Sequence, residues 1–332
     1  MKRKIKILNM FDISPCPGVF DVLDENMEVL SIPGDDRRKA KDSIREFDAC
    51  IASLKIILDK EILDEAANLK VIATVSTGTD HIDVEYAKKR GIEIISLKDD
   101  IKFLDSITST AELAWGLLLA AVRKKPWAFD AAKEGVWARD LFRGHQLSGK
   151  TLGIIGYGRL GRIVAQYGKA FRMNVIACDL KEVSPESHVK MVSMDHLLES
   201  SDVISIHVHL TPENRGLINA DSFNRMKPGA VLINTSRGAI VDEKAFLVAL
   251  ETGRLSAAGI DVIDGEWNEN LKEHPLIRYS NTHDNLVITP HLGGVTFEAQ
   301  KSAVEFTVLK LRAKLRLLMS LFILCTIFTR II

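Results

Sequence analysis

The chain has 332 residues, with 44 Lys and Arg balanced by 44 Asp and Glu, 46% hydrophobic residues and 27% charged residues. This length predicts about two globular domains, and the lack of net charge gives no overall attraction to nucleic acid or an acidic membrane surface. The composition is that of an ordinary globular protein, which excludes a collagen, an extended disordered chain and a disulfide-stapled mini-domain.

The four cysteines predict neither a metal site nor a disulfide framework. Cys16, Cys50, Cys178 and Cys325 lie far apart, and none belongs to a CxxC pair or a Cys/His cluster. We therefore expect no metal, and a reducing, cytoplasmic location. Residues 1–8 are basic but lack the apolar core and cleavage site of a signal peptide, so they predict a first strand instead.

The first hundred residues alternate short apolar runs with amphipathic ones. This alternation predicts a parallel sheet covered by helices on both faces. The predicted strands are 5–9, 27–31, 49–53, 71–75 and 92–96, and the predicted helices lie near 35–47, 60–67 and 84–90.

A long apolar helix is predicted to follow. The sequence Ser-Thr-Ala-Glu at 109–112 fits a capping box with Ser109 as the N-cap. The run 113–122 is apolar on nearly every face. We therefore expect this helix to be buried, either between domains or against a second subunit.

A second series of strands and helices begins at Lys150. A helix at 242–252 ends on Gly253, a residue type suited to the left-handed cap position. The six strand-like runs predict a doubly wound nucleotide-binding domain. These runs are 151–155, 174–178, 203–207, 230–234, 257–260 and 286–289.

Residues 156–161, Gly-Tyr-Gly-Arg-Leu-Gly, fit the G-x-G-x-x-G fingerprint of dinucleotide sites. They directly follow the predicted strand 151–155 and open a helix that reaches Ala170, the context that the fingerprint requires. Gly156 permits the tight turn, Gly158 lets the backbone approach a pyrophosphate, and Gly161 lets the helix pack on the strand.

Two further features of this segment predict NAD as the cofactor. The N–H groups of Arg159 and Leu160 lie at the predicted helix N-terminus, where the helix dipole favours phosphate. Asp179 ends the next strand, 18 residues after Gly161. Its carboxylate can accept from both ribose hydroxyls and repels a 2′-phosphate, which favours NAD over NADP.

Polar side chains also follow the other predicted strands. In doubly wound sheets, ligands bind at the carboxyl ends of the strands. A cation for a carboxylate and an acid–base pair are therefore expected beside the cofactor. The candidates are Ser76, Thr77 and Gly78 after 71–75, Arg237 after 230–234, Asp261 and Glu266 after 257–260, and His291 after 286–289.

These segments resemble the D-isomer-specific 2-hydroxyacid dehydrogenases, with a likeness to D-3-phosphoglycerate dehydrogenase. The resemblance rests on residues 156–161, 233–238, 259–262 with Glu266, and 289–294. It implies an α/β fold of two doubly wound parallel-sheet domains with a cleft between them. A flavodoxin-like substrate domain would take 1–104 and 295–332, and a Rossmann NAD-binding domain would take 105–294.

The resemblance also implies an NAD-dependent, reversible oxidation of a 2-hydroxy acid to a 2-keto acid. Arg237 would hold the substrate carboxylate and polarise the C2 oxygen, and His291 would exchange the hydroxyl proton. Glu266 would hydrogen-bond the imidazole, fixing its tautomer and favouring its charged form. Ser76, Thr77 and Gly78 would complete the carboxylate site. The NAD-binding residues would be Gly156, Gly158, Arg159, Leu160, Gly161, Asp179, Val208, Thr235, Asp261 (on the nicotinamide carboxamide), Gly293 and Gly294.

Substrate and partners follow from the resemblance in less detail. A hydroxypyruvate/glycerate or 3-phosphoglycerate type of substrate is expected, in a homodimer formed through the NAD-binding domain. No nucleic acid and no integral membrane span are expected. His207-Val208-His209 stands where family members commonly show His-x-Pro, so the path of the loop on the adenine side stays open.

Other functions stay open beside the dehydrogenase. A regulatory protein could bind NAD(H) as a signal, but it would need no proton relay such as His291 and Glu266. A formate-type enzyme is disfavoured because that branch carries Gln where Glu266 stands, and a phosphite-type enzyme remains possible. Asp261 could instead cap a turn. The remaining histidines outside these strand ends are expected to be ordinary polar residues.

The C-terminal segment departs from the family pattern, which closes with an amphipathic helix on the first domain. After Glu305 there is no acidic residue, whereas 306–332 include five basic residues. The apolar run 317–329 is shorter than the roughly 20 residues of a membrane span. Three interpretations stay open: a helix buried against protein, a basic helix on a membrane surface or partner, and a divergent terminus that packs poorly.

Overall fold

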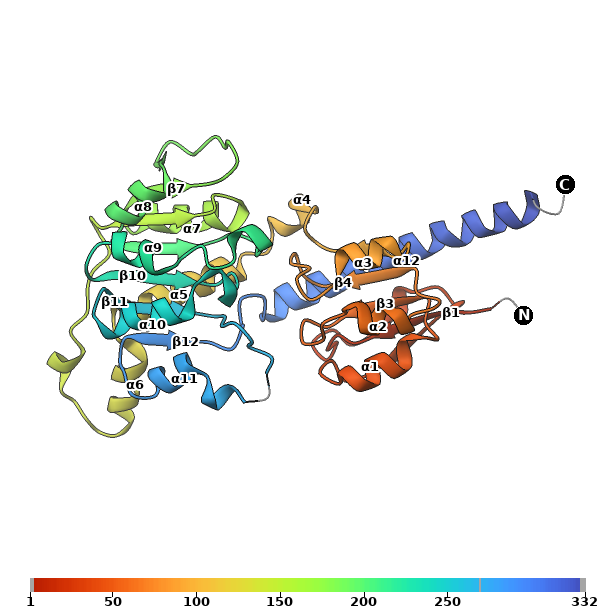
Figure 1. Ribbon diagram of the computed structural model, residues 1–332, viewed down its shortest axis with the longest axis horizontal. Helices are drawn as coiled ribbons and strands as arrows, with labels where there is room; N and C mark the ends of the chain where they lie inside the picture. Colours follow the sequence, from red (N-terminus) through yellow and green to blue (C-terminus); the bar gives the residue numbers. More distant parts are fainter. Residues whose placement is uncertain (1–2, 269, 329–332) are drawn as a thin grey trace. The chain divides into compact units, whose positions relative to one another are not determined.

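The computed structural model describes residues 3–268 and 270–328, and side chains as far as residue 320 (Figure 1). The chain divides into two compact units. The first unit takes the chain up to Leu104 and again from Thr296, and the second unit spans Asp105–Val295.

The first unit contains a five-stranded parallel sheet in the order β2-β1-β3-β4-β5. This is the flavodoxin-like 2-1-3-4-5 order, so the predicted fold of this part is confirmed. The strands are β1 (Ile5–Asn9), β2 (Met27–Ser31), β3 (Ala49–Ala52), β4 (Val71–Thr74) and β5 (Glu93–Ile95). The helices are η1 (Val19–Val22), α1 (Arg37–Ile44), α2 (Lys60–Glu65), α3 (Val84–Lys89), α4 (Ile101–Leu104) and α12 (Phe297–Phe328).

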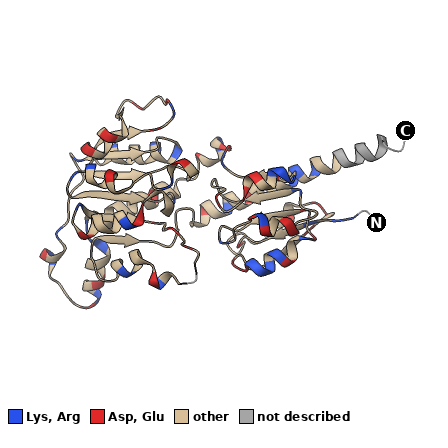
Figure 2. Cartoon of the chain, in the orientation of Figure 1, with Lys and Arg blue, Asp and Glu red and all other residues tan. Residues whose placement is uncertain are grey.

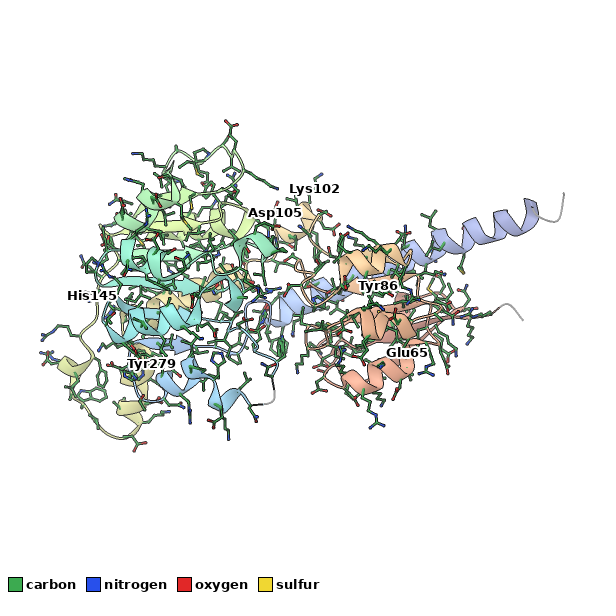
Figure 3. All side chains as sticks on the ribbon, viewed as in Figure 1. Glu65, Tyr86, Lys102, Asp105, His145 and Tyr279 are labelled. Atoms are coloured by element: carbon green, nitrogen blue, oxygen red, sulfur yellow. The ribbon has the colours of Figure 1, made fainter. Side chains whose placement is uncertain are left out.

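Alternate residues of these strands supply two cores, one on each face of the sheet. Leu8 and Cys50 pack with α1, α2 and α3, whereas their neighbours Ile7 and Ile51 pack with η1 and α12. Figure 3 labels Glu65 on α2 and Tyr86 on α3, two helices that are in contact. The sheet is therefore buried on both faces, as parallel sheets require.

Helix α12 corrects the expectation that the C-terminal segment lacks the family's closing helix. Its apolar residues Val304, Val308, Leu311 and Leu315 are buried in the core of the first unit. The basic residues in its middle (Figure 2) are paired with this unit: Lys310 with Asp100, Lys314 with Glu93, and Arg316 with Asp24. Of the three interpretations, burial against protein is therefore confirmed as far as Leu315. Leu317, which begins the apolar run, is 52% exposed, and the run beyond residue 320 lies outside the described side chains.

The second unit contains a seven-stranded parallel sheet in the order β12-β11-β10-β9-β6-β7-β8. Counted from β6, this is the Rossmann order 3-2-1-4-5-6 with one more strand at the edge, which confirms the predicted fold class. The strands are β6 (Thr151–Ile155), β7 (Asn174–Cys178), β8 (Val189–Met191), β9 (Val203–Ile206), β10 (Ala230–Asn234), β11 (Leu255–Ile260) and β12 (Leu286–Ile288).

Helices cover both faces of this sheet. Helices α5 and α7 pack on one face, and α8 to α11 pack on the other. The helices are α5 (Ser109–Val122), α6 (Lys125–Lys133), η2 (Arg139–Phe142), α7 (Arg159–Ala170), α8 (Met194–Ser200), η3 (Pro212–Asn214), α9 (Ala220–Arg225), η4 (Gly238–Ile240), α10 (Glu243–Glu251), η5 (Leu271–Glu273) and α11 (Pro275–Ser280).

The sequence predicts six strands in this unit, and β8 is a seventh that was not predicted. It has three residues, Val189–Met191, and pairs with β7 at the edge of the sheet. The predicted end of helix α10 is confirmed: Asp242 accepts the N–H groups of Lys244 and Ala245 at its start, and Gly253 follows it with φ of 70°. Gly253 adopts this left-handed conformation without the steric cost of a Cβ.

The predicted start of α5 was wrong. Its N-cap is Thr108, and Ser109 is the first helical residue, so the predicted capping box does not form. The predicted burial of the helix is confirmed, and the elements that cover it are β10, β11 and α7 of its own unit. A Cβ on Gly259 of β11 would lie 2.9 Å from the Leu117 side chain, which shows how closely helix and sheet approach.

Candidate active site

All strands of the second unit are parallel, so they end at one edge of the sheet, which we call the carboxyl edge. The opposite edge, where they begin, is the amino edge. The predicted site residues of this unit follow β6, β7, β9, β10, β11 and β12, and the topology therefore brings them to the carboxyl edge. The strand order reverses between β6 and β9, the position where such sheets bind ligands.

The glycine loop after β6 leaves room for a ligand. Gly156 has φ of 93°, and a Cβ on Gly161 would lie 2.1 Å from the Gly156 carbonyl oxygen, so both positions require glycine. A Cβ on Gly158 would meet no protein atom within 4 Å. Gly158 is the N-cap of α7 and, as a glycine, offers no side chain to cap this helix. The N-terminal N–H groups of α7 are therefore directed to the space that Gly158 leaves open.

Asp179 holds the glycine loop as well as lying where the ribose was predicted. Its Oδ2 accepts the N–H of Tyr157 at 2.8 Å, and its Oδ1 accepts the N–H of Lys181 at 2.9 Å. Each carboxylate oxygen has two lone pairs, so one acceptor position on each oxygen is left for a ligand hydroxyl. The contact with Tyr157 was not anticipated from the sequence.

The predicted acid–base pair is in contact. His291 Nδ1 lies 2.6 Å from Glu266 Oε1, and both side chains are less than one-fifth exposed. Among the described residues, the buried Glu266 Oε2 has no hydrogen-bond partner. Trp267 stacks on the imidazole with ring centroids 5.9 Å apart, a contact that could not be predicted from the sequence. The carboxylate leaves Nε2 of His291 as the ring nitrogen available to a substrate.

Asp261 holds the loop that carries His291. Asp261 is almost completely buried, with 1% of the residue exposed. Its carboxylate accepts the Thr289 hydroxyl at 2.6 Å and the N–H groups of Leu292 and Gly293 at 2.7 and 2.8 Å. Burial raises the pKa of the Asp261 carboxyl, and these hydrogen bonds oppose the rise. His291 itself has φ of 56°, a conformation that these bonds maintain. The predicted contact of Asp261 with the nicotinamide carboxamide stays a prediction.

Arg237 is presented by a turn that buried polar groups hold. The Asn234 side chain accepts the N–H of Ser236 and donates to the carbonyl of Arg237, and the Ser236 hydroxyl donates to the carbonyl of Ile206. A Cβ on Gly238 would lie 2.1 Å from the backbone carbon of Ile263. The turn after β10 is thus packed directly on the segment after β11, which carries Glu266.

The remaining predicted cofactor residues also lie at the carboxyl edge. Val208 lies against Gly156, since a Cβ there would lie 2.6 Å from its side chain. Within the described part of the chain, the buried Thr235 hydroxyl has no hydrogen-bond partner. The carbonyl of Gly293 accepts the Thr110 hydroxyl at 2.9 Å, whereas a Cβ on Gly294 would meet nothing within 4 Å. Their contacts with NAD stay predictions.

His207, beside Val208, is fixed in its neutral form. Burial lowers the pKa of His207 from its ordinary 6.5 to about 4. Its Nε2 lies 2.8 Å from the Ser205 hydroxyl. A neutral imidazole at the end of β9 adds no cation to the cofactor side of the site, and among the described residues its buried Nδ1 has no hydrogen-bond partner.

The predicted substrate residues Ser76, Thr77 and Gly78 belong to the first unit and follow β4. The Ser76 hydroxyl donates to the carbonyl of Gly78 at 2.6 Å and lies 2.9 Å from the Thr74 hydroxyl. Thr74 also contacts the buried His81, which was predicted to be an ordinary polar residue. These bonds fix the loop, and the carboxylate-binding role that the resemblance gives it stays a prediction.

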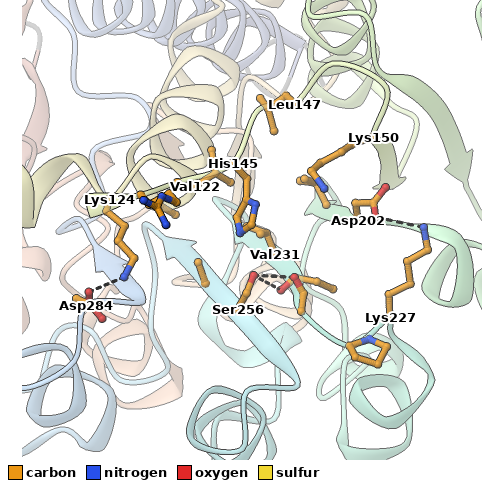
Figure 4. A pocket seen from close by; sticks show the side chains of 18 residues that line it. Val122, Lys124, His145, Leu147, Lys150, Asp202, Lys227, Val231, Ser256 and Asp284 are labelled. Atoms are coloured by element: carbon orange, nitrogen blue, oxygen red, sulfur yellow. Dashed lines mark hydrogen bonds and ion pairs between the residues drawn. The ribbon is translucent and has the colours of Figure 1, made fainter. Parts of the chain in front are cut away.

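A cavity in the second unit lies away from this site. It has a volume of about 340 Å³ and lies at the amino edge, where residues 150, 202–203, 228–231, 256–257 and 284 begin or precede the strands. Figure 4 shows its two ion pairs, Lys124 with Asp284 at 2.8 Å and Lys227 with Asp202 at 3.3 Å. None of the predicted site residues lines it.

The site and fold together define a dinucleotide-binding protein of the doubly wound class. Residues 115–293 match the family model described as D-isomer specific 2-hydroxyacid dehydrogenase, NAD binding domain. The chain belongs to this family, and its NAD-binding domain is the matched region.

Individual relatives agree. The chain is 37% identical over 299 residues to a D-3-phosphoglycerate dehydrogenase of Methanocaldococcus jannaschii, covering 89% of this chain and 55% of that protein. It is 38% identical over 258 residues to a hydroxypyruvate reductase of Thermotoga maritima, covering 78% of this chain and 81% of that protein. The chain thus spans about half the length of the phosphoglycerate dehydrogenases that it matches.

A solved structure shows the same fold along nearly the whole chain. The D-lactate dehydrogenase of Aquifex aeolicus, solved with NAD and lactic acid, superimposes with a TM-score of 0.83 at 30% identity and covers 94% of this chain and 95% of that chain. Among the described residues, no helix has both the length and the apolar character needed to cross a membrane. The described part of the chain likewise contains no cluster of His, Cys, Asp and Glu that could hold a metal ion.

Proposed function

We propose that this protein is an NAD-dependent dehydrogenase that interconverts a small D-2-hydroxy acid and its 2-keto acid. The contact between His291 Nδ1 and Glu266 Oε1 carries the proposal. The Glu266 carboxylate binds one ring nitrogen of His291 and orients the ring, so that the other nitrogen can act as an acid or a base. A protein that only senses NAD(H) needs no such group. Glu at position 266, in place of Gln, also favours a reaction in which a hydroxyl proton must be moved.

The residues present fit NAD. The open space beside Gly158 and the uncapped start of α7 suit a pyrophosphate, and the lone pairs left on Asp179 suit a ribose. The buried Thr235 hydroxyl offers a further polar group. NAD, when bound, accepts or supplies the hydride. The chain supplies the binding groups, the carboxylate clamp and the proton.

Each reacting group then has one task. Arg237 binds the substrate carboxylate through two parallel N–H groups and polarises the oxygen on C2. His291 Nε2 removes the hydroxyl proton during oxidation and returns it to the carbonyl oxygen during reduction. Glu266 stabilises the imidazolium that forms while the proton is on the ring. Asp261 and Trp267 keep the imidazole in place.

The substrate that we propose is of the hydroxypyruvate/glycerate or 3-phosphoglycerate type. The relatives named as D-3-phosphoglycerate dehydrogenase and hydroxypyruvate reductase support this class. A cytoplasmic location is part of the same hypothesis.

The test is a panel of 2-keto acids with NADH and NADPH. Hydroxypyruvate, phosphohydroxypyruvate, glyoxylate and pyruvate are each mixed with the enzyme, and loss of reduced-nicotinamide absorbance is followed. We expect turnover with NADH of at least one acid and much weaker turnover with NADPH, because Asp179 repels a 2′-phosphate. If NADH binds but no acid is reduced, the protein is a sensor and the proposal is wrong.

We also propose that the protein forms a homodimer through its NAD-binding domain. The segment 123–147 between α5 and β6 exposes a set of large apolar side chains that a partner would cover: Phe129, Val136, Trp137 (89% exposed) and Leu141. Sedimentation velocity of the wild type and of Trp137→Asp tests this, with a dimer expected for the former and a weakened dimer for the latter. A wild-type monomer at micromolar concentration would contradict it.

A further inference from the structure

A second His–Glu pair lies behind the proposed acid–base pair. Glu243 is the first residue of α10, and His274 is the N-cap of α11. His274 Nε2 lies 3.1 Å from Glu243 Oε2, and both side chains are less than one-quarter exposed. Neither residue belongs to the predicted catalytic, cofactor or substrate groups, so their contact needs another explanation.

The hydrogen bonds around His274 define its tautomer. Its Nδ1 accepts the N–H of Leu276 at 3.3 Å, which caps the start of α11. A ring nitrogen that accepts a hydrogen bond carries no proton, so the proton is on Nε2. Nε2–H therefore donates to Glu243, and the neutral ring satisfies both neighbours.

The other oxygen of Glu243 reaches the segment that carries Glu266. Glu243 Oε1 accepts the N–H of Asp264 at 2.8 Å. Asp264 lies between Asp261, which holds the His291 loop, and Glu266, which contacts His291. One carboxylate thus joins the start of α11 to the short segment 261–267, which connects the two halves of the proposed site.

The same segment is packed against the turn of Arg237. A Cβ on Gly238 would lie 2.2 Å from the backbone nitrogen of Asp264, the group that donates to Glu243. Glu243 and Gly238 also line one small cavity of about 10 Å³ together with Val262 and Leu276. A shift of the Asp264 backbone would therefore move Glu266 and disturb the packing against the Arg237 turn.

The charges that face Glu243 come from two neighbours. His274 and Asp264 are its titratable neighbours, and Asp264 is paired with Arg215 at 3.2 Å. Burial raises the pKa of the Glu243 carboxyl, while the Asp264 N–H and His274 oppose the rise. A buried carboxylate that receives a defined hydrogen bond on each oxygen is a rigid connection, since losing either donor leaves an unsatisfied acceptor.

We propose that Glu243 and His274 are positioning residues that hold segment 261–267 so that Glu266 meets His291 Nδ1. The inference rests on the proposed function, in which Glu266 stabilises the imidazolium of His291. It assigns no contact with substrate or cofactor to either residue. It predicts that a change at His274 alters the proton step through Glu266, and alters cofactor binding little.

His274→Asn is the variant that isolates the pair. Asn is a good N-cap, so it keeps the start of α11 capped, but it is too short to reach Glu243 as the imidazole does. We expect kcat for keto-acid reduction to fall about tenfold, within the ~10²-fold that a 1 Å misplacement can cost. The pH at which reduction falls on the alkaline side should move lower, because a misplaced carboxylate stabilises the protonated imidazole less. The Kd of NADH should stay within about twofold.

A double-mutant cycle separates positioning from a general loss of stability. In a Glu266→Gln background, His274→Asn should lower kcat no further, because its effect acts through the carboxylate that is already gone. Glu243→Gln removes the same bond to His274 while keeping an acceptor for Asp264, so it should reproduce the shifted pH profile. His196→Asn, on the exposed face of α8, is the matched control and should behave as the wild type.

The outcomes are distinct. An unshifted pH profile in both His274→Asn and Glu243→Gln would overturn the proposal. So would a loss of kcat from His274→Asn that is equally large in the wild-type and the Glu266→Gln backgrounds. If the wild type reduces no keto acid, the proposed function fails, and the ¹⁵N NMR titration of the His291 imidazole replaces kinetics. There, a lower titration midpoint in His274→Asn supports positioning, and an unchanged midpoint refutes it.

Discussion

The carboxyl and amino edges of the seven-stranded sheet both carry charged side chains, but these are held in different ways. At the amino edge, Lys124 and Lys227 each pair with an aspartate, and the partners are partly exposed. At the carboxyl edge, Asp261 is buried and its carboxylate accepts three hydrogen bonds. The buried Oε2 of Glu266 has no hydrogen-bond partner among the described residues. The amino edge also has a cavity of about 340 Å³.

The proposed site is therefore assigned from its polar side chains, and none of the predicted site residues lines the amino-edge cavity. Each charge of the two amino-edge ion pairs is already balanced by its partner. A buried polar side chain that the backbone holds in place, and that has an atom without a hydrogen-bond partner, is available to a ligand. Its burial is unfavourable by itself, and functional sites commonly contain such groups. The comparison can be tested by matched changes at the two edges.

The largest effect is expected at His291. His291→Ala should lower kcat by about 10²–10⁴, the scale of a lost general acid–base, and should leave the Kd of NADH nearly unchanged. The matched change at the amino edge is His145→Ala, because His145 lines the cavity there (Figure 4) and is exposed. It should leave kcat unchanged. Steady-state kinetics of both variants decide the matter, and equal losses would remove the distinction between the edges.

A smaller effect is expected at Arg237. Arg237→Lys keeps the charge but loses the planar pair of donors, so kcat/KM should fall about 10- to 100-fold, as the loss of a charge-assisted hydrogen bond predicts. Lys150→Ala, at the amino-edge cavity, removes a whole charge and should change kcat/KM less than about twofold, since surface charges contribute little. A normal kcat/KM in Arg237→Lys would mean that the carboxylate is bound elsewhere.

Much of the fold could be predicted from the sequence because apolar runs and turn residues are local signals. Strands β1, β2, β6, β7 and β10 have the predicted bounds. Strand β8 was missed because its three residues, Val-Lys-Met, show too little alternation to be recognised. The burial of α12 could be predicted only as one of three interpretations, because basic residues lie between its regularly spaced apolar residues 304, 308, 311 and 315.

The site could be predicted only as far as the residues follow strand ends or fit the family motifs. His291 and Glu266 were found in this way, and their contact confirms that the two strand ends converge. Asp264 reaching Glu243 and Trp267 stacking on His291 depend on how a loop folds back, for which one sequence contains no periodic signal. The three hydrogen bonds that Asp261 accepts also depend on the conformation of a loop, so they could not be predicted either.

The third prediction compares two aspartates, one at each end of β6. Asp179 accepts the N–H of Tyr157 after the strand, and Asp202 accepts that of Thr151 at its start. Asp179→Asn keeps an oxygen for Tyr157 but removes the charge, so the Kd of NAD should rise about tenfold and discrimination against NADP should shrink. Asp202→Asn should change neither. Fluorescence titrations with both cofactors measure this, and an unchanged NADP/NAD ratio in Asp179→Asn would contradict the ribose role.

The smallest effect is expected at the amino-edge ion pair itself. Although burial alone raises the pKa of Asp202, the Thr151 N–H and Lys227 lower it below the ordinary 3.8. A folded-state pKa below that of the unfolded chain stabilises the fold above about pH 4, and this contribution is lost as the pH falls through the folded value. Lys227→Met should therefore cost at most about 1 kcal/mol at pH 7 and less near pH 3, with kcat unchanged. Urea unfolding at both pH values measures the loss of stability. A larger loss of stability, or any loss of turnover, would contradict the prediction and show that the amino edge contributes to the proposed site.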